Sequence, residues 1–294
     1  MNPLADQLNE QIAQENIHLY DLLSDLGKRL YFPKGILTQT AEAKQKASRY
    51  NATIGMATEN DRPMYLPLIQ ETLAYYDPKD LYTYAPPGGK PELREAWKNK
   101  ILRENPSLKG KLISKPMVTN ALTHGLSIIA DLFVNQDDPL IIPDKNWGNY
   151  ITIFGVRRGA RIVTYPFYTE QGTINISGLK RCLLSQKEHR KAILVLNFPN
   201  NPTGYTPTEA EATEIVQTVK EVAEQGLNLV VVTDDAYFGL FYENSITESL
   251  FARLADIHPR VLAVKIDGTT KEEYVWGFRV GFITNAICSN SNHK

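Results

Sequence analysis

The chain has 294 residues, of which 43% are hydrophobic and 22% are charged, the composition of an ordinary soluble globular protein. Its 32 Lys and Arg residues nearly balance its 33 Asp and Glu residues, so we expect neither nucleic acid nor a membrane as a partner. Two cysteines, Cys182 and Cys288, lie in no metal-ligand spacing with the five histidines. They predict no metal site and favour a reducing cytoplasm over a disulfide framework.

The predicted elements fall into two stretches. Residues 6–29 predict one helix followed by a loop around 32–35, and residues 91–103 predict another helix with a proline in its first turn. From about residue 113, apolar runs alternate with helical patterns. The runs predict strands at 115–119, 139–143, 161–165, 192–196, 228–233, 261–265 and 279–284. The patterns between them predict helices at 123–133, 149–157, 177–185, 208–225 and 248–255.

The apolar runs lack the alternation of polar and apolar residues that a half-exposed strand has. Such runs indicate strands covered on both faces, as in a sheet flanked by helices. We therefore expect an α/β fold, a layered domain with a mostly parallel sheet.

The segment from Asn197 to Pro207 contains Asn201-Pro202-Thr203-Gly204 and joins a predicted strand to a predicted helix. Open α/β sheets bind ligands at the carboxyl ends of their strands, so Asn201 is a candidate ligand residue. A plain strand-to-helix turn is the alternative, but this sequence in this place favours a site.

A second strand runs into Asp234, Asp235 and Tyr237. A carboxylate there could pair with a protonated pyridine nitrogen, and the tyrosine hydroxyl could reach a phenolic oxygen on the same ring. Because side chains alternate along a strand, at most one of the two aspartates should face the ring. Alone, a solvated pair of strand-end carboxylates would be the more ordinary explanation.

Three weaker candidates follow other predicted elements. Ala121, Leu122 and Thr123 open a helix, where free backbone N–H groups suit a phosphate. Trp147 offers a flat indole for stacking on a planar ring. Tyr84 lies in a stiff loop before a helix. An ordinary turn without a binding function is the default expectation there.

Lys271 precedes Arg279 by eight residues in a loop that leads into the last predicted strand. A lysine amine can form a Schiff base with an aldehyde cofactor, and an arginine fork suits a phosphate. Taken alone, both residues could be ordinary exposed charges.

Read in order, these segments resemble the class I/II aminotransferases, fold-type I enzymes that depend on pyridoxal 5′-phosphate. The resemblance covers residues 31–284, with Asn201-Pro202-Thr203-Gly204, Asp234 with Tyr237, and Lys271 with Arg279 as its most specific parts. It implies the three-layer α/β/α fold with a seven-stranded sheet. It also implies a homodimer with amino acid and 2-oxo acid substrates.

By this resemblance, Lys271 would hold the cofactor as a Schiff base and move the proton of the substrate's α-carbon. Asp234 would pair with the pyridine nitrogen, Asn201 and Tyr237 would contact the phenolic oxygen, and Trp147 would stack on the ring. The phosphate would be held by Ala121, Leu122, Thr123, Thr270 and Arg279, with Tyr84 reaching the phosphate site of the neighbouring subunit.

The chain departs from the family pattern in two places within the site. The family usually has a hydroxyl residue three before the lysine, where this chain has Gly268, so Thr269 or Thr270 would take that contact. The phosphate loop reads Ala121-Leu122-Thr123 where glycine or serine is common; backbone donors survive such changes.

The sequence also stops 23 residues after Lys271, whereas family members continue into a small domain that carries an arginine for the substrate's carboxylate. We therefore expect a C-terminally truncated chain with little activity of its own. Residues 1–45 would be an N-terminal arm and part of the small domain, and 46–294 an incomplete cofactor-binding large domain. A lyase or decarboxylase of the same fold, or a non-catalytic cofactor-binding remnant, remains the alternative.

Overall fold

The computed structural model describes residues 2–31, 36–53, 55–60, 62–189 and 191–288. The chain forms two compact units, Met1–Met64 and Tyr65–Lys294. The predicted loop at 32–35 lies outside the described residues, and the assignment of an arm and a large domain stays a prediction. No helix in the described parts of the chain has the length and apolar character needed to cross a bilayer.

The first unit contains short helices where one long helix was predicted. They are α1 (Pro3–Glu15), α2 (Ile17–Leu22), α3 (Asp25–Arg29) and α4 (Ile36–Lys46), followed by the short antiparallel strands β1 (Thr58–Glu59) and β2 (Arg62–Pro63). The single helix over 6–29 is wrong because polar residues interrupt it. Asn16 is extended and ends α1, and the Ser24 hydroxyl accepts a bond from the Gly27 N–H to start α3, a common competition between side chain and helix.

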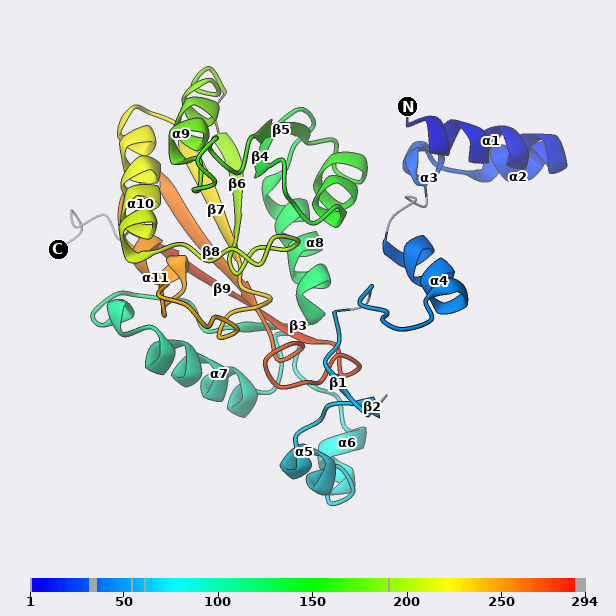
Figure 1. Ribbon diagram of the computed structural model, residues 1–294, viewed down its shortest axis with the longest axis horizontal. Helices are drawn as coiled ribbons and strands as arrows, with labels where there is room; N and C mark the ends of the chain where they lie inside the picture. The colour runs from blue at the N-terminus through cyan, green and yellow to red at the C-terminus, as the bar shows by residue number, and fades with distance from the viewer. Residues whose placement is uncertain (1, 32–35, 54, 61, 190, 289–294) are drawn as a thin grey trace. The chain divides into compact units, whose positions relative to one another are not determined.

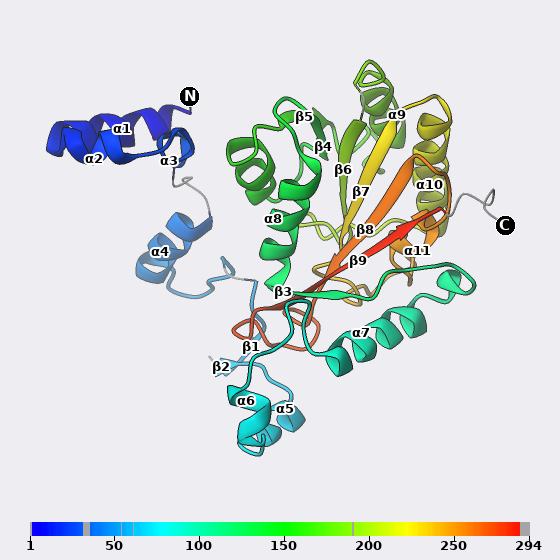
Figure 2. The ribbon, with the colours of Figure 1, turned by 180° about the vertical axis from the view of Figure 1, so that it is seen from behind.

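The second unit is built on the predicted seven-stranded sheet, shown in Figures 1 and 2. Its strands in chain order are β3 (Met117–Asn120), β4 (Pro139–Pro143), β5 (Arg161–Tyr165), β6 (Lys191–Asn197), β7 (Asn228–Asp234), β8 (Val261–Asp267) and β9 (Val280–Ile287). Their order across the sheet is β3-β9-β8-β7-β6-β4-β5, and only β9 pairs antiparallel, with β3 and β8. The mostly parallel sheet is confirmed.

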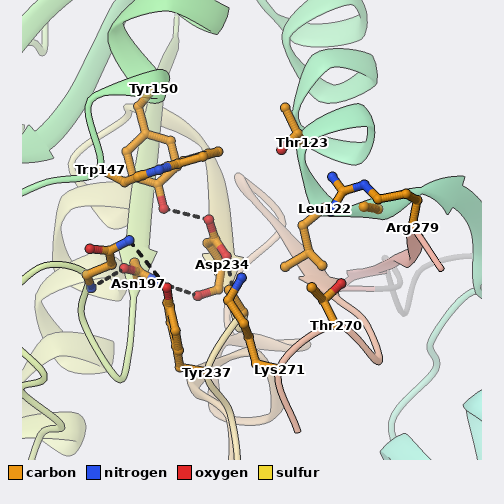
Figure 3. A pocket seen from close by; sticks show the side chains of 13 residues that line it. Leu122, Thr123, Trp147, Tyr150, Asn197, Asp234, Tyr237, Thr270, Lys271 and Arg279 are labelled. Carbon is orange, nitrogen blue, oxygen red and sulfur yellow. Dashed lines mark hydrogen bonds between the residues drawn. The ribbon is translucent and has the colours of Figure 1, made fainter. Parts of the chain in front are cut away.

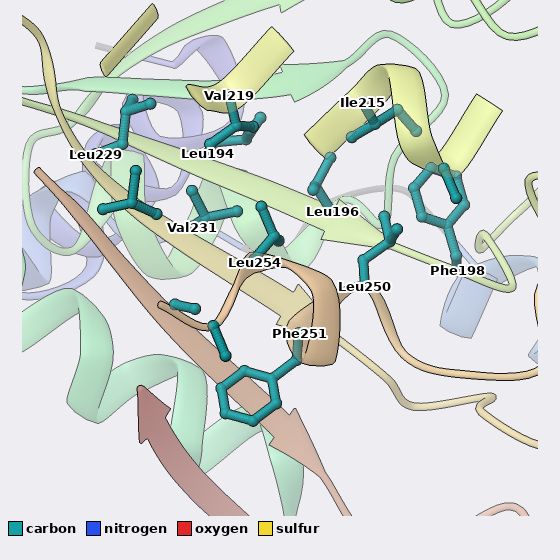
Figure 4. Close-up of a cluster of buried hydrophobic side chains, with 14 of the residues drawn as sticks. Leu194, Leu196, Phe198, Ile215, Val219, Leu229, Val231, Leu250, Phe251 and Leu254 are labelled. Carbon is teal, nitrogen blue, oxygen red and sulfur yellow. The ribbon is translucent and has the colours of Figure 1, made fainter. Parts of the chain in front are cut away.

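Successive residues of the strands point to opposite faces of the sheet and belong to two separate hydrophobic cores. The sheet therefore lies between two layers of helices. On one face, Leu194 and Val231 pack among side chains of α9 (Ile176–Leu184), α10 (Glu209–Glu224) and α11 (Leu250–Leu254), part of which Figure 4 shows. On the other face, Ile193 and Val230 join residues of α8 (Ala121–Phe133). Burial on both faces is what the unbroken apolar runs require.

The remaining helices of the unit are α5 (Pro67–Thr72), α6 (Pro78–Tyr82) and α7 (Pro91–Glu104), with 3-10 turn η1 (Pro106–Leu108). The predicted helix over 149–157 is a π-helical segment, η2 (Ile151–Val156). Helix α10 begins with a capping box in which Thr208 and Glu211 exchange hydrogen bonds. This fixes the start of the helix that follows the Asn201 loop.

Candidate active site

A cavity of about 220 Å³ lies where the predicted site segments meet, at the carboxyl ends of β6 and β7 and the start of α8. Figure 3 shows side chains from these elements and from the β8–β9 loop pointing into it. Its lining residues are Ala121, Leu122, Thr123, Trp147, Tyr150, Asn197, Asn201, Asp234, Ala236, Tyr237, Thr270, Lys271 and Arg279. This edge of a parallel sheet is the usual place for ligands in open α/β folds.

Asp234, the last residue of β7, places a buried carboxyl group at the floor of the cavity. Its Oδ2 accepts a hydrogen bond of 2.6 Å from the Tyr150 hydroxyl, and its Oδ1 accepts one of 3.2 Å from the Ala236 N–H. Burial raises the pKa of Asp234 to about 6, although these bonds oppose the rise. The carboxylate is therefore held in place, and the charge of Lys271 lowers its pKa too little to offset burial.

Two asparagines and a tyrosine form the wall beside Asp234. The Asn197 side chain donates to the Asp234 carbonyl at 2.7 Å and accepts from the Asn201 N–H at 2.7 Å. Asn201 in turn donates through Nδ2 to the Tyr237 hydroxyl at 3.4 Å. Asn197 thus connects the turn at Asn201 to the end of β7. The amide of Asn201 and the hydroxyl of Tyr237 therefore lie together in the cavity.

Lys271 reaches the same cavity from the loop between β8 and β9. Its Nζ lies 5.3 Å from the centre of the Tyr237 ring. Burial lowers the pKa of Lys271; Asp234 opposes this, and Arg279 lowers the pKa further. A lysine with a lowered pKa has more of the neutral amine that attacks a carbonyl.

The far side of the cavity is suited to an anion. Helix α8 starts there, and no side chain of the described residues caps its first N–H groups, which leaves them free for a ligand. Arg279 lines this side, and Thr270, only 4% exposed, has a hydroxyl without a hydrogen-bond partner among the described residues. A buried orphan hydroxyl, a guanidinium and a helix start together fit a phosphate.

Close backbone packing holds this anion-binding side together. A Cβ on Gly281 would lie 2.6 Å from the carbonyl carbon of Ala121, so only glycine lets β9 approach the start of α8. Ala121 and Arg279 both have left-handed backbone, with φ of 61° and 56°. Strained backbone of this kind is often found at functional sites.

The same packing accounts for Gly268. A Cβ there would meet Leu122 Cδ1 at 2.8 Å and the Val280 carbonyl at 2.5 Å. The Leu122 side chain thus fills space that a side chain at 268 would need. Of the two threonines considered for the missing hydroxyl contact, Thr270 lines the cavity and Thr269 does not.

Ten of the eleven residues proposed from the sequence line this cavity; Tyr84 does not, and its side chain is fully exposed. Trp147 packs edge-on against Tyr150, with 5.5 Å between ring centres. Three further lining residues were not predicted from the sequence: Tyr150, Asn197 and Ala236. Asn197 was detectable, because it ends β6 directly opposite Asp234 of β7.

Comparison with known proteins points to one family. The chain is 26% identical over 284 residues to an aspartate aminotransferase of Bacillus sp. YM-2, covering 93% of this chain and 68% of that protein. It is 30% identical over 206 residues to a probable aspartate/prephenate aminotransferase of Thermus aquaticus, covering 68% of this chain and 48% of that protein. The chain thus spans about half to two thirds of such relatives.

Solved structures agree on the fold. An aminotransferase from Anaerococcus prevotii superposes with a TM-score of 0.79 at 22% identity, covering 91% of this chain and 68% of that one. The cytoplasmic aspartate aminotransferase of Saccharomyces cerevisiae gives 0.73 at 21% identity, covering 94% and 66%. A family model of class I and II aminotransferases matches residues 59–288, and the chain therefore belongs to that family.

Proposed function

We propose that this chain holds pyridoxal 5′-phosphate, the cofactor of its family, on Lys271 and serves the transfer of an amino group from an amino acid to a 2-oxo acid. The observation that carries the proposal is the convergence of Lys271, Asp234 and an anion-binding corner with an unsatisfied Thr270 hydroxyl in one cavity. When bound, the cofactor supplies an aldehyde for the lysine amine and a ring that draws electrons from the substrate's α-carbon.

Each wall of the cavity has a distinct task in this proposal. Arg279, Thr270 and the first N–H groups of α8 would bind the phosphate, and Trp147 would pack against the ring. Asn201 and Tyr237 would donate hydrogen bonds to the phenolic oxygen. Asp234 would accept a hydrogen bond from the ring nitrogen, and Tyr150 orients its carboxylate through the 2.6 Å bond.

The amine of Lys271 then has two roles, covalent attachment and proton transfer. Burial lowers its pKa, which increases the share of free amine that can attack the aldehyde. As a free amine in this cavity, the same Nζ would be a base able to take the proton of a substrate's α-carbon and to return it.

The nature of the amino acid is a separate question. Several similar proteins bear the name aspartate aminotransferase, which makes aspartate the first amino donor to try. Elimination or decarboxylation on the same cofactor is the alternative, and the identity of the product separates it from transamination.

We further propose a homodimer in a reducing cytoplasm. Two cysteines in 294 residues are too few for a disulfide framework, which suits that compartment. Many large apolar side chains on α5, α6 and the neighbouring loops are exposed. Such a surface is typical of an interface between protein subunits. These side chains are Tyr65, Leu66, Leu68, Leu73, Tyr75, Tyr76, Leu81, Tyr82 and Tyr84. Light scattering across a concentration series tests the dimer, since a constant monomer mass contradicts it.

The activity test supplies pyridoxal phosphate, aspartate and 2-oxoglutarate and measures oxaloacetate and glutamate. Formation of both products by the parent and neither by Lys271→Ala supports transamination. Alanine, β-alanine or ammonia without glutamate would point to elimination or decarboxylation. A parent that turns over no amino acid although it binds the cofactor would contradict a catalytic role.

A further inference from the structure

We propose that helix α7 is a positioning element for Lys271, because Trp97 and Lys100 hold the β8–β9 loop at two points on either side of that lysine. The inference rests on the proposed role of Lys271 in cofactor binding. Trp97 and Lys100 are three residues apart and lie on the same face of α7, and neither belongs to the cavity lining. Their effect on the site is therefore indirect, through the residues that they contact.

The first point of attachment precedes Lys271. The Trp97 indole N–H donates to Asp267 Oδ1 at 3.0 Å, and both residues are buried. The Trp97 ring stacks on Phe282 of β9, with centroids 4.0 Å apart and 12° between planes. Since Asp267 is the last residue of β8 and Phe282 lies near the start of β9, Trp97 anchors both ends of the loop that carries Lys271.

The second point of attachment directly follows Lys271. Lys100 Nζ lies 2.9 Å from Glu272 Oε2, 3.5 Å from Glu273 Oε1 and 2.8 Å from Glu104 Oε1. Only 17% of the Lys100 side chain is exposed, so these are not freely solvated surface pairs. Burial alone would lower the pKa of Lys100, but the hydrogen bonds and negative charges of Glu104 and Glu272 raise it.

The Lys100 ammonium thus pairs with three carboxylates, and two of them, Glu272 and Glu273, follow Lys271 directly in the sequence. Without Lys100, Glu104, Glu272 and Glu273 would repel one another at close range. Glu104 belongs to α7, whereas Glu272 and Glu273 belong to the β8–β9 loop. We therefore expect the loop to move away from α7, which would increase the distance between these carboxylates. Such a movement displaces Lys271 Nζ from Asp234 and Tyr237.

The attachment continues into the sheet on the side away from the cavity. Lys265 of β8 contacts Asp235 and lies 3.4 Å from Asp267 Oδ2. Ser249 donates to Asp235 Oδ2 at 2.6 Å. A continuous set of polar contacts therefore links α7, the end of β8 and the end of β7, whose Asp234 lines the cavity.

Two readouts test this role. Hydrogen–deuterium exchange of the cofactor-free chain is measured for peptides covering 268–279 in the parent, Lys100→Met, Lys100→Arg and the control Lys98→Met, which alters another face of α7. We expect about fivefold faster exchange in Lys100→Met, parental rates in Lys98→Met and recovery in Lys100→Arg. Equal rates in Lys100→Met and the parent would overturn the proposal.

The second readout is cofactor binding, followed by the visible absorbance of the lysine-bound form. Lys100→Met should raise the pyridoxal phosphate concentration that gives half-saturation about fivefold. It should also shift the pH at which the visible absorbance band of the lysine-bound cofactor changes. Adding Glu272→Gln and Glu273→Gln to Lys100→Met should recover part of the loss, because the repulsion is gone. Parental binding in Lys100→Met would overturn the positioning role alone, whereas no band in the parent would reject the proposed function itself.

Discussion

Asp234 and Asp235 are neighbours in sequence, yet their carboxylates lie on opposite faces of the sheet. Asp234 accepts from Tyr150 in the cavity. Asp235 accepts from Ser249 and pairs with Lys265 on the other face. The alternation of a strand thus separates a carboxylate available to a ligand from one engaged in the core, so the two substitutions should differ in kind.

Asp234→Asn should weaken pyridoxal phosphate binding and stabilise the cofactor-free chain at pH 8. An amide cannot accept a charge-assisted bond from a protonated ring nitrogen, so we expect about tenfold weaker binding. It can still bond to both the Ala236 N–H and the Tyr150 hydroxyl. The matched variant Asp235→Asn should instead lower stability, by about 3 kcal/mol, because it leaves buried Lys265 without its closest carboxylate.

The stabilising effect of Asp234→Asn should depend on pH. Burial raises the pKa of Asp234 from 3.8 to about 6, so between these values the unfolded chain releases the proton while the folded chain keeps it. Stability is therefore lost as pH rises through this window, by about 3 kcal/mol in full. Thermal melts of parent and variant should nearly coincide at pH 4 and diverge by pH 7. A pH-independent difference would contradict the assignment.

Thr270→Val should have opposite effects on the free and the cofactor-bound chain. Valine has the shape of threonine but removes a buried hydroxyl that has no partner among the described residues, so the cofactor-free chain should gain about 1 kcal/mol. The cofactor phosphate would lose a donor, and its binding should weaken. Thr269→Val, which does not alter the cavity lining, is the control. Unchanged binding in Thr270→Val would rule out the phosphate contact.

Gly281→Ala should disrupt the anion-binding side without touching any charged group. The added methyl would lie 2.6 Å from the Ala121 carbonyl carbon and 2.9 Å from the Leu122 nitrogen, which forces α8 away from β9 and costs about 1–3 kcal/mol. Gly277→Ala meets no atom within 4 Å. Melting temperature and phosphate binding should fall in the first variant only. Equal behaviour of the two would contradict the packing described here.

Tyr150→Phe should matter most when Asp234 is ionised. The buried carboxylate loses its 2.6 Å bond, a contribution of about 2 kcal/mol for a bond to a charged group. Destabilisation should therefore be larger at pH 8 than at pH 5, and binding of the cofactor should weaken. Tyr242→Phe, at an exposed position, should do neither. A loss that is the same at both pH values would argue against the Tyr150–Asp234 bond.

The sequence was sufficient for the sheet because each strand is an unbroken apolar run, as in 228–234. It also predicted that Asp234 and Asp235 diverge, since that follows from strand geometry alone. Tyr150 was missed because its role depends on a hydrogen bond across 84 residues of sequence. The polar contacts of Trp97 and Lys100 with the loop span 170 and 172 residues, so no local pattern reveals them.

The break of the predicted helix over 6–29 has a different origin. Asn16 takes an extended backbone that ends α1, and the Ser24 hydroxyl accepts a hydrogen bond from the Gly27 N–H as the cap of α3. Helices α5, with six residues, and α6, with five, were not predicted, because segments this short contain too few residues to show a helical period.

Covalent binding of pyridoxal phosphate by Lys271 can be measured directly. The chain is mixed with the cofactor, its visible absorbance is recorded, and the complex is reduced with borohydride and digested for mass spectrometry. We expect a visible band in the parent and none in Lys271→Ala, with the reduced pyridoxyl group on the peptide that contains Lys271. A parent without the band, or a pyridoxyl group fixed on another lysine, would contradict the account.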